Sequence, residues 1–265
     1  MSYSVLESKV LEDTPKESRV AINNDISDMS DYDESLETKL FTKDGVGYVQ
    51  LVDCMGSDLS IVNAARVSYG RVSKEFNEKD MKLLKYLWTH EHTSPFRHET
   101  ISFKIKCPIF VLRQWMKHTI GCAWNEQSGR YTELKYGYFK PQDWRLQDTT
   151  NKQGSIVIAD ETTRQQANAI LDETYESIEN CYKKLLELGI GREQARIVLP
   201  LSTYTECVWT ASLQAIVHFL DLRLDSNAQY EIREFAMIIL ELTEKKFPKT
   251  FQMLREIDFI QEAPI

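Results

Sequence analysis

Several features that mark common protein classes are missing from this chain of 265 residues. It contains no GxGxxG fingerprint, no GxxxxGK[ST] loop and no GxSxG elbow. These absences argue against a Rossmann dehydrogenase, a P-loop NTPase and a hydrolase of the nucleophile-elbow type. No apolar run approaches the roughly 20 residues needed to span a bilayer, and the N-terminus lacks the basic-then-apolar order of a secretory signal. A dinucleotide, if one binds, binds outside a Rossmann fold.

Cysteines are few, and acidic residues outnumber basic ones. The 5 cysteines are scattered and form no CxxC pair, so nothing suggests a zinc knuckle or a redox motif. We expect reduced thiols and, with the missing signal, a cytoplasmic location. Lys and Arg number 32 against 40 Asp and Glu, for a net charge of -8. This balance argues against binding to a nucleic acid polymer or an anionic membrane, whereas a local basic pocket for one phosphate is still allowed.

The composition changes near residue 45. Residues 1–44 are rich in Asp, Glu, Ser and Thr, and residues 25–35 have too little apolar content to offset the entropy of ordering. We therefore predict a mobile or loosely attached acidic extension over residues 1–44 and one folded domain over residues 45–265. The alternative is that the extension packs onto the domain through its few apolar side chains, which are Val5, Leu6, Val10 and Leu11.

The folded part mixes two periodicities. Alternation of apolar and polar residues predicts strands over residues 46–56, 98–108 and 202–213. Helical spacing, with Asp58 as the N-cap of the first helix, predicts helices over residues 58–70, 78–89, 108–118, 160–188, 192–200, 213–223 and 228–247, and a short one after Pro248. No regular βαβ spacing is present, so the pattern indicates an α+β fold.

The segment Arg113–Tyr131 gathers groups that suit a phosphate. Arg113 and Lys117 are four residues apart at the end of a predicted helix, a pattern that a solvated helix face also produces. The sequel NEQSGRY, interpreted as a loop, adds a flexible glycine, the hydroxyl of Ser128 and the guanidinium of Arg130. Glu126 cannot serve a phosphate directly and needs a donor partner.

Two further arginines stand beside apolar stretches, where an unpaired guanidinium is costly to bury. Arg196 lies in ARIVLP and Arg223 in DLRLDSNAQ. Each of them either has a structural acid partner, Asp221 or Asp225 in the case of Arg223, or faces an anionic ligand, and the pattern alone leaves both open.

Three of the five histidines, His90, His92 and His98, stand in the segment HEHTSPFRH. Their spacing suggests metal ligands, but Pro95 breaks any helix and no i, i+4 ligand pair is formed, so we do not predict a metal.

Six segments stand in the order found in one enzyme family. They are VQLVDCMGSDLSIVNAARVS, HTSPFRH, RQW, NEQSGRY, ARIVLPL and LRLDSNAQYEI. From about Gly47 to the C-terminal helices, the chain resembles the flavin-dependent thymidylate synthases. The resemblance implies a central antiparallel-rich sheet and reductive methylation of dUMP to dTMP. Methylenetetrahydrofolate would donate the one-carbon unit and NADPH would act through FAD as reductant. It also implies a homotetramer with active sites shared between subunits, and no nucleophilic cysteine.

The family signature is altered in this chain. The family has Arg-His-Arg, seven residues and then Ser, whereas here Lys117, His118 and Thr119 are followed by eight residues before Ser128. Lys117 keeps a point charge and Thr119 loses one, which weakens flavin or phosphate contacts unless another cation compensates. Arg97 is a candidate for that cation.

The resemblance assigns roles position by position. Arg223 matches the arginine credited with ionising N3 of the uracil ring. The dUMP-binding positions are Gln114, Trp115, Met116, Lys117, Glu126, Gln127, Ser128, Gly129, Arg130, Arg196 and Arg223. The FAD-binding positions are Ser94, Lys117, His118, Thr119, Glu126, Ser212, Leu213, Gln214 and His218. Ser68 and His92 match positions near the flavin and the folate.

Two other functions are compatible with the altered signature. One is a related flavin- and folate-dependent methylase or hydroxymethylase that acts on dCMP or dUMP. The other is a non-catalytic homologue that binds flavin or nucleotide without turnover.

Overall fold

The computed structural model describes residues 39–260, except 134–136, 150, 153 and 158–159. All the described residues belong to one unit, Glu34–Ile265. The acidic extension predicted for residues 1–44 lies outside the described residues as far as residue 38, and the boundary at residue 45 stays a prediction. The last part of that segment has a described structure, because Lys39–Phe41 form a strand, β1.

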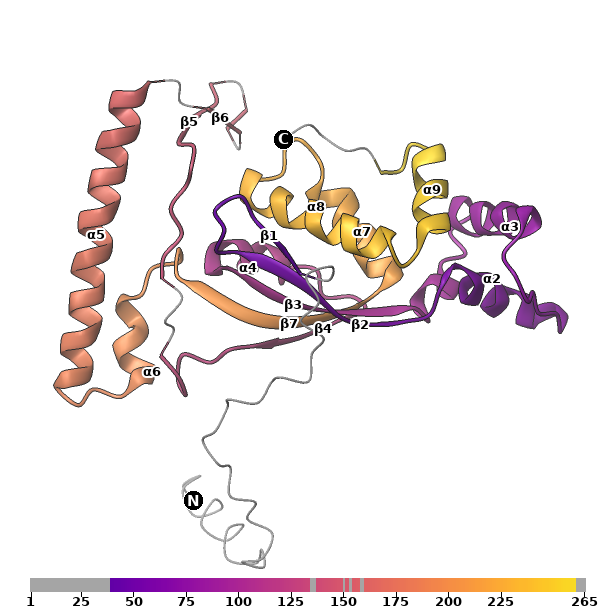
Figure 1. Ribbon diagram of the computed structural model, residues 1–265, viewed down its shortest axis with the longest axis horizontal. Coiled ribbons are helices and arrows are strands. Elements are labelled where there is room, and N and C mark those ends of the chain that lie inside the picture. The colour runs from indigo at the N-terminus through magenta and orange to yellow at the C-terminus, as the bar shows by residue number, and fades with distance from the viewer. Residues whose placement is uncertain (1–38, 134–136, 150, 153, 158–159, 261–265) are drawn as a thin grey trace, which may run out of the picture. The chain divides into compact units, whose positions relative to one another are not determined.

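An antiparallel sheet of five strands forms the centre of this unit (Figure 1). Its order is β1, β2 (Tyr48–Met55), β3 (Thr100–Pro108), β7 (Tyr204–Ser212) and β4 (Cys122–Glu126). Every neighbouring pair is antiparallel. The prediction of an α+β fold with an antiparallel-rich sheet is therefore confirmed.

One face of the sheet carries the core. Along β3 the side chains of Ile101, Phe103 and Ile105 are fully buried, and the residues between them are half-buried. Alternation of this kind arises because successive side chains of a strand point to opposite faces. On the buried face the ring of Trp115 stacks on Phe219 with 4.7 Å between centroids. Packing of this face therefore depends on large aromatic rings as well as on aliphatic side chains.

Helices cover that face (Figure 1). The helix α4 (Ile109–Trp115) packs on β3, α7 (Leu213–Arg223) on β7 and α8 (Tyr230–Glu244) on β2. A second group consists of α2 (Asp58–Arg66), α3 (Glu78–Thr89) and α9 (Pro248–Glu256), which contact one another. Short turns follow α2 and α3, namely η3 (Val67–Tyr69) and η4 (Ser94–Arg97). The helices predicted over residues 78–89 and 213–223 are confirmed with the same bounds.

The long helix α5 (Glu161–Glu187) packs against α6 (Arg192–Ala195) and the turn η5 (Arg196–Val198). Among its described side chains only Tyr175 and Tyr182 are buried. A two-stranded hairpin, β5 (Arg145–Gln147) and β6 (Ser155–Val157), precedes it. Most of the surface of α5 is thus left uncovered by the part of the chain that the structure describes.

The predicted N-cap of the first helix was wrong. The cap is Ser57, whose side chain accepts a hydrogen bond from the backbone of Ser60, and Asp58 is the first helical residue. The carboxylate of Asp58 instead accepts bonds at the start of α9, from the backbone of Lys249 at 2.9 Å and of Thr250 at 2.8 Å. Sequence spacing gave no signal for this contact, because the partners are 191 and 192 residues away.

We expect Asp58→Ala to lower the free energy of unfolding by about 2–3 kcal/mol, because the backbone amides of Lys249 and Thr250 lose a buried carboxylate acceptor. Urea unfolding followed by circular dichroism at one protein concentration measures the effect. The control is Ser57→Ala, which removes an exposed cap worth about 1 kcal/mol. Equal losses in the two variants would contradict the role given to Asp58.

The first two residues of NEQSGRY, the segment interpreted as a loop, belong to a strand instead. β4 covers CAWNE, and its Trp124 lies opposite Trp209 of β7 with 5.5 Å between ring centroids. Glu126 pairs with Cys207 at the end of the strand, so the loop begins at Gln127. The strand is short, half exposed and at the sheet edge, which is why its alternation is weak.

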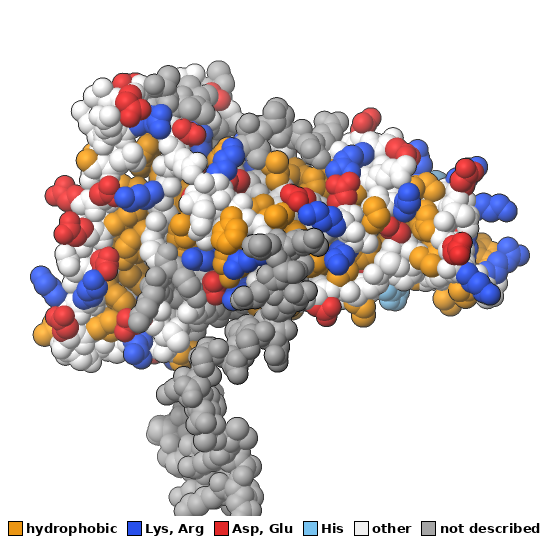
Figure 2. Space-filling view, in the orientation of Figure 1, with side chains coloured by type: hydrophobic (Ala, Val, Ile, Leu, Met, Phe, Trp, Pro, Cys, Tyr) orange, Lys and Arg blue, Asp and Glu red, His pale blue; other side chains and the backbone are white. Residues whose placement is uncertain are grey.

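None of the described helices is long and apolar enough to cross a membrane. Within the described residues, no group of three His, Cys, Asp or Glu side chains is placed to hold a metal ion. All five cysteines are free thiols. On the face drawn in Figure 2, acidic and basic side chains alternate with apolar ones and no extended surface of one sign is formed.

Candidate active site

The ends of α4 and α7 meet at Arg223. Its Nε donates a hydrogen bond of 3.0 Å to Nε2 of His118, and its Nη2 donates to the carbonyl oxygen of Gln114 at 3.3 Å. Neither Asp221 nor Asp225 forms an ion pair with it, and no other carboxylate of the described residues does so. The sequence left two partners open for Arg223, a structural acid or an anionic ligand. No structural acid among the described residues neutralises this half-buried guanidinium, so the anionic ligand is favoured.

The hydrogen bond to Arg223 fixes the state of His118. A guanidinium only donates, so Nε2 of His118 accepts and must carry no proton. Burial of the ring, the charge of Arg223 and the nearby His218 together lower the pKa of His118 to about 4. The rings of His118 and His218 are 6.0 Å apart. The neutral imidazole therefore adds no charge, and Arg223 is the cation of this group.

We expect His118 to remain neutral at pH 6 and to titrate near the value of about 4, below its ordinary 6.5. A depressed pKa means that the folded protein binds fewer protons than the unfolded chain. The stabilising contribution of His118 is thus full above pH 6.5 and is lost as the pH falls through about 4. Nitrogen NMR of labelled imidazole rings measures this, and Arg223→Ala should raise the pKa. A value near 6.5 in the unchanged protein would refute the assignment.

A second group follows β4. Glu126 accepts a hydrogen bond of 2.9 Å from Oγ1 of Thr205, which supplies the donor that the sequence left unnamed. Arg130 forms an exposed ion pair of 3.3 Å with Glu193 of α6, and its backbone amide donates to Oγ of Ser128 at 3.3 Å. Thr205 and Glu193 were not predicted. Threonine in an alternating strand and glutamate on a short helix carry no signal of their own.

Gln127 begins the loop after β4. Its Nε2 donates to Oγ1 of Thr132 at 3.1 Å and its backbone amide donates to the carbonyl of Glu206 at 2.8 Å. Its Oε1 is buried and has no partner among the described residues. Buried acceptors are nearly always satisfied, so this atom is a point where a ligand or a water can donate.

A cavity of about 460 Å³ lies beside α7. This volume falls within the range of about 300–1,000 Å³ found for small-molecule sites. Gln214 and His218, both predicted to bind FAD, line it with Thr93. Its other walls are Trp88, Phe259 and Ile257, with Thr89 and Glu91. The cavity thus combines flat apolar walls with hydrogen-bonding edges.

The other predicted positions are placed as follows. The side chains of Trp115 and Leu213 are fully buried, so any ligand contact there involves the backbone. Ser212 caps α7 by accepting from the amide of Ala215 at 3.3 Å. Residues exposed or half-exposed on the described surface are Ser94, Met116, Lys117, Thr119 and Arg196, and Gly129 is buried. Arg97 is exposed on η4, which packs against α7.

Within one chain the two groups stay separate. No hydrogen bond or ion pair of the described residues joins Gln114, His118 and Arg223 to the group that follows β4. Arg196 likewise has no such partner in the described part of the chain.

Comparison of the chain with known proteins shows which family it belongs to. The sequence model described as "Thymidylate synthase complementing protein" matches residues 50–249. The chain belongs to the flavin-dependent thymidylate synthase family. A flavin-dependent thymidylate synthase of Kosmotoga olearia is 44% identical over 217 residues, which cover 82% of this chain and 92% of the relative. An enzyme of the same name from Thermus thermophilus is 44% identical, with 79% of this chain and 76% of the relative covered.

Solved structures agree with the sequence comparison. A UMP/dUMP methylase, PolB from Streptomyces cacaoi bound with 5-Br UMP, is similar with a TM-score of 0.73 and 31% identity. The likeness covers 81% of this chain and 96% of that one. The α+β fold is thereby confirmed as that of the family.

The residues present fit a flavin. A tricyclic ring needs flat apolar walls and donors or acceptors at its edge, which the cavity beside α7 supplies through Trp88, Phe259, Gln214 and His218. The exposed Lys117 is a point charge suited to an anionic part of the cofactor.

Proposed function

We propose that this chain catalyses the reductive methylation of dUMP to dTMP. Methylenetetrahydrofolate serves as the one-carbon donor, and NADPH provides the reducing equivalents through FAD. The observation that carries this proposal is Arg223, a half-buried cation without a carboxylate partner among the described residues, in a chain of this family.

Arg223 acts on the pyrimidine. Its charge stabilises negative charge at N3 of the uracil ring, which makes C5 more nucleophilic toward the one-carbon unit. His118, being neutral, leaves that charge uncompensated and holds the guanidinium through Nε. The carbonyl of Gln114 holds Nη2. Two of the donors of Arg223 are thus used for orientation, and the others are left for substrate.

The remaining predicted residues bind and orient. Arg130 and Ser128 bind the phosphate of dUMP, and Arg196 completes that pocket. A bound flavin would supply the hydride that reduces the transferred carbon. Gln214, His218 and Thr93 bind the edge of its ring in the cavity beside α7. The chain needs no nucleophilic cysteine, and burial raises the pKa of Cys122, the thiol of the motif segment.

We further propose a homotetramer in which several subunits complete each site. Large apolar side chains are exposed beside predicted site residues, as expected for surfaces that a second copy covers. They are Val67 (75%), Tyr69 (80%), Ile120 (89%), Tyr131 (74%) and Ile197 (79%). The uncovered surface of α5 and the separation of the two groups within one chain support the same assembly. Its cytoplasmic location stays a prediction from the sequence.

The test is an assay of the purified protein with dUMP, methylenetetrahydrofolate and NADPH, with the product identified by mass spectrometry. UMP is a second candidate substrate, because the similar PolB is a UMP/dUMP methylase. UMP and dCMP are therefore assayed alongside. We expect dTMP from dUMP. Product from UMP or dCMP alone would overturn the proposal. Flavin that NADPH reduces but dUMP and folate never reoxidise would indicate the non-catalytic homologue.

A further inference from the structure

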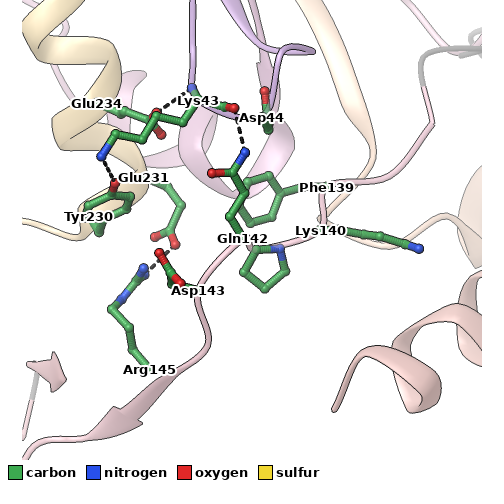
Figure 3. A pocket seen from close by; sticks show the side chains of 11 residues that line it. Lys43, Asp44, Phe139, Lys140, Gln142, Asp143, Arg145, Tyr230, Glu231 and Glu234 are labelled. Carbon is green, nitrogen blue, oxygen red and sulfur yellow. Dashed lines mark hydrogen bonds and ion pairs between the residues drawn. The ribbon is translucent and has the colours of Figure 1, made fainter. Parts of the chain in front are cut away.

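Gln114 is held at its side chain as well as at its backbone. Its Nε2 donates a hydrogen bond to Oε1 of Gln229, in the connection between α7 and α8. Gln229 in turn donates from Nε2 to Oε2 of Glu231 at 2.8 Å. The other oxygen of Glu231 forms an ion pair with Arg145 of β5 (Figure 3). One side chain, Gln229, thus connects Gln114 to an ion pair that the sequence did not predict.

The ion pair between Glu231 and Arg145 determines which group donates in the hydrogen bonds from Gln229 to Glu231 and from Gln114 to Gln229. Glu231 is buried, with 6% of its surface exposed, and its carboxylate paired with a guanidinium only accepts hydrogen bonds. Arg145 is fixed in turn, since it also donates to Oγ of Ser155 at 3.1 Å and lies 4.8 Å from the centroid of the Tyr230 ring. Rotation of the Gln229 amide would face its oxygen toward this carboxylate. Gln229 therefore keeps Nε2 toward Glu231 and Oε1 toward Gln114.

The orientation of the Gln114 carboxamide follows in the same way. Because Gln229 presents an oxygen, Gln114 must present its Nε2, and its own Oε1 is left as an acceptor. The backbone carbonyl of Gln114 accepts from Arg223, so the residue is held from two sides. Gln114 is half-buried, and the residue that presents this acceptor also holds Arg223 through its backbone carbonyl.

We propose that Gln229 is a positioning residue that fixes the carboxamide of Gln114 with its oxygen toward the pyrimidine nucleotide. That oxygen then accepts a hydrogen bond from an N–H or O–H of dUMP. The inference rests on the proposed function and adds to it a residue that touches no substrate. It also gives the ion pair of Arg145 and Glu231 a purpose beyond joining β5 to α8.

Gln229→Met tests the inference, because it keeps the length of the side chain and removes the amide. We expect the dissociation constant of dUMP, measured by calorimetry, and the KM for dUMP to rise about tenfold, the cost of one misdirected hydrogen bond. The kcat should change by less than about twofold, since the transition state is stabilised elsewhere. The matched control is Gln252→Met on α9, whose amide donates to Glu256 at 3.0 Å away from the site. It should change neither constant.

A double variant separates positioning from a structural role. If Gln229 acts through Gln114, Gln114→Ala combined with Gln229→Met should bind dUMP no more weakly than Gln114→Ala alone. Additive losses, unchanged affinity in Gln229→Met, or an equal loss in Gln252→Met would each overturn the inference. A fall in kcat and in thermal stability with no change in KM would also overturn it. If the wild-type protein neither binds nor converts dUMP, the proposed function itself is contradicted.

Discussion

Arg223→Ala is expected to lower kcat for dUMP by at least about 100-fold, the usual cost of removing a group that stabilises charge in the transition state. The guanidinium is half-buried, has no carboxylate partner among the described residues, and is oriented by His118 and Gln114. Without Arg223, the group that it forms with His118 and Gln114 contains no cation. Flavin should still bind and be reduced by NADPH, because the cavity beside α7 is lined by other residues.

Two variants make this result interpretable. Arg223→Lys keeps a charge but loses the fork that donates to His118 and Gln114 together, so it should recover only part of the rate. Arg164→Ala removes an arginine that already pairs with Asp143 and Glu161 and should leave kcat unchanged. The readouts are the rate of dTMP formation and the absorption spectrum of bound flavin before and after NADPH. Near-normal turnover in Arg223→Ala would remove this residue from its assigned role.

The fold followed from periodicity wherever an element was long and had one buried face. The alternation of Ile101, Phe103 and Ile105 predicted β3 because each of these side chains meets the same core. The short edge strand β4 and the three-residue strand β1 were missed, since their formation depends on partners distant in sequence rather than on their own pattern.

The site was predictable as residue types but not as contacts. The family order named Arg223 and His118 and gave no indication that they are hydrogen-bonded across 105 positions. Nor did the sequence point to Gln229, an ordinary exposed glutamine whose meaning comes from its place between Gln114 and the buried Glu231. Hydrogen-bond direction is a property of assembled neighbours, which single-sequence patterns do not contain.

The second large effect concerns Arg130. We expect Arg130→Ala to raise the KM for dUMP by about 10- to 100-fold, because a charge-assisted bond to the phosphate is lost. The Arg130–Glu193 ion pair is exposed on both sides and worth little to the fold, so stability should hardly change. Glu193→Ala is the matched control, since it breaks the same pair and keeps the arginine. An unchanged KM in Arg130→Ala would show that this loop does not bind the phosphate.

Arg130→Ala and Arg223→Ala together decide how the site is assembled. If one subunit provides Arg223 and another Arg130, each variant alone is deficient, but a tetramer that mixes both contains intact sites. Random assembly of equal amounts pairs the two unaltered residues in about a quarter of the sites, because each must come from the right copy. Co-expressed variants carrying different tags, purified through both tags, should therefore regain about a quarter of wild-type activity at low dUMP. If Arg130 and Arg223 of a site come from the same subunit, no activity should be regained, because every chain lacks one of the two residues.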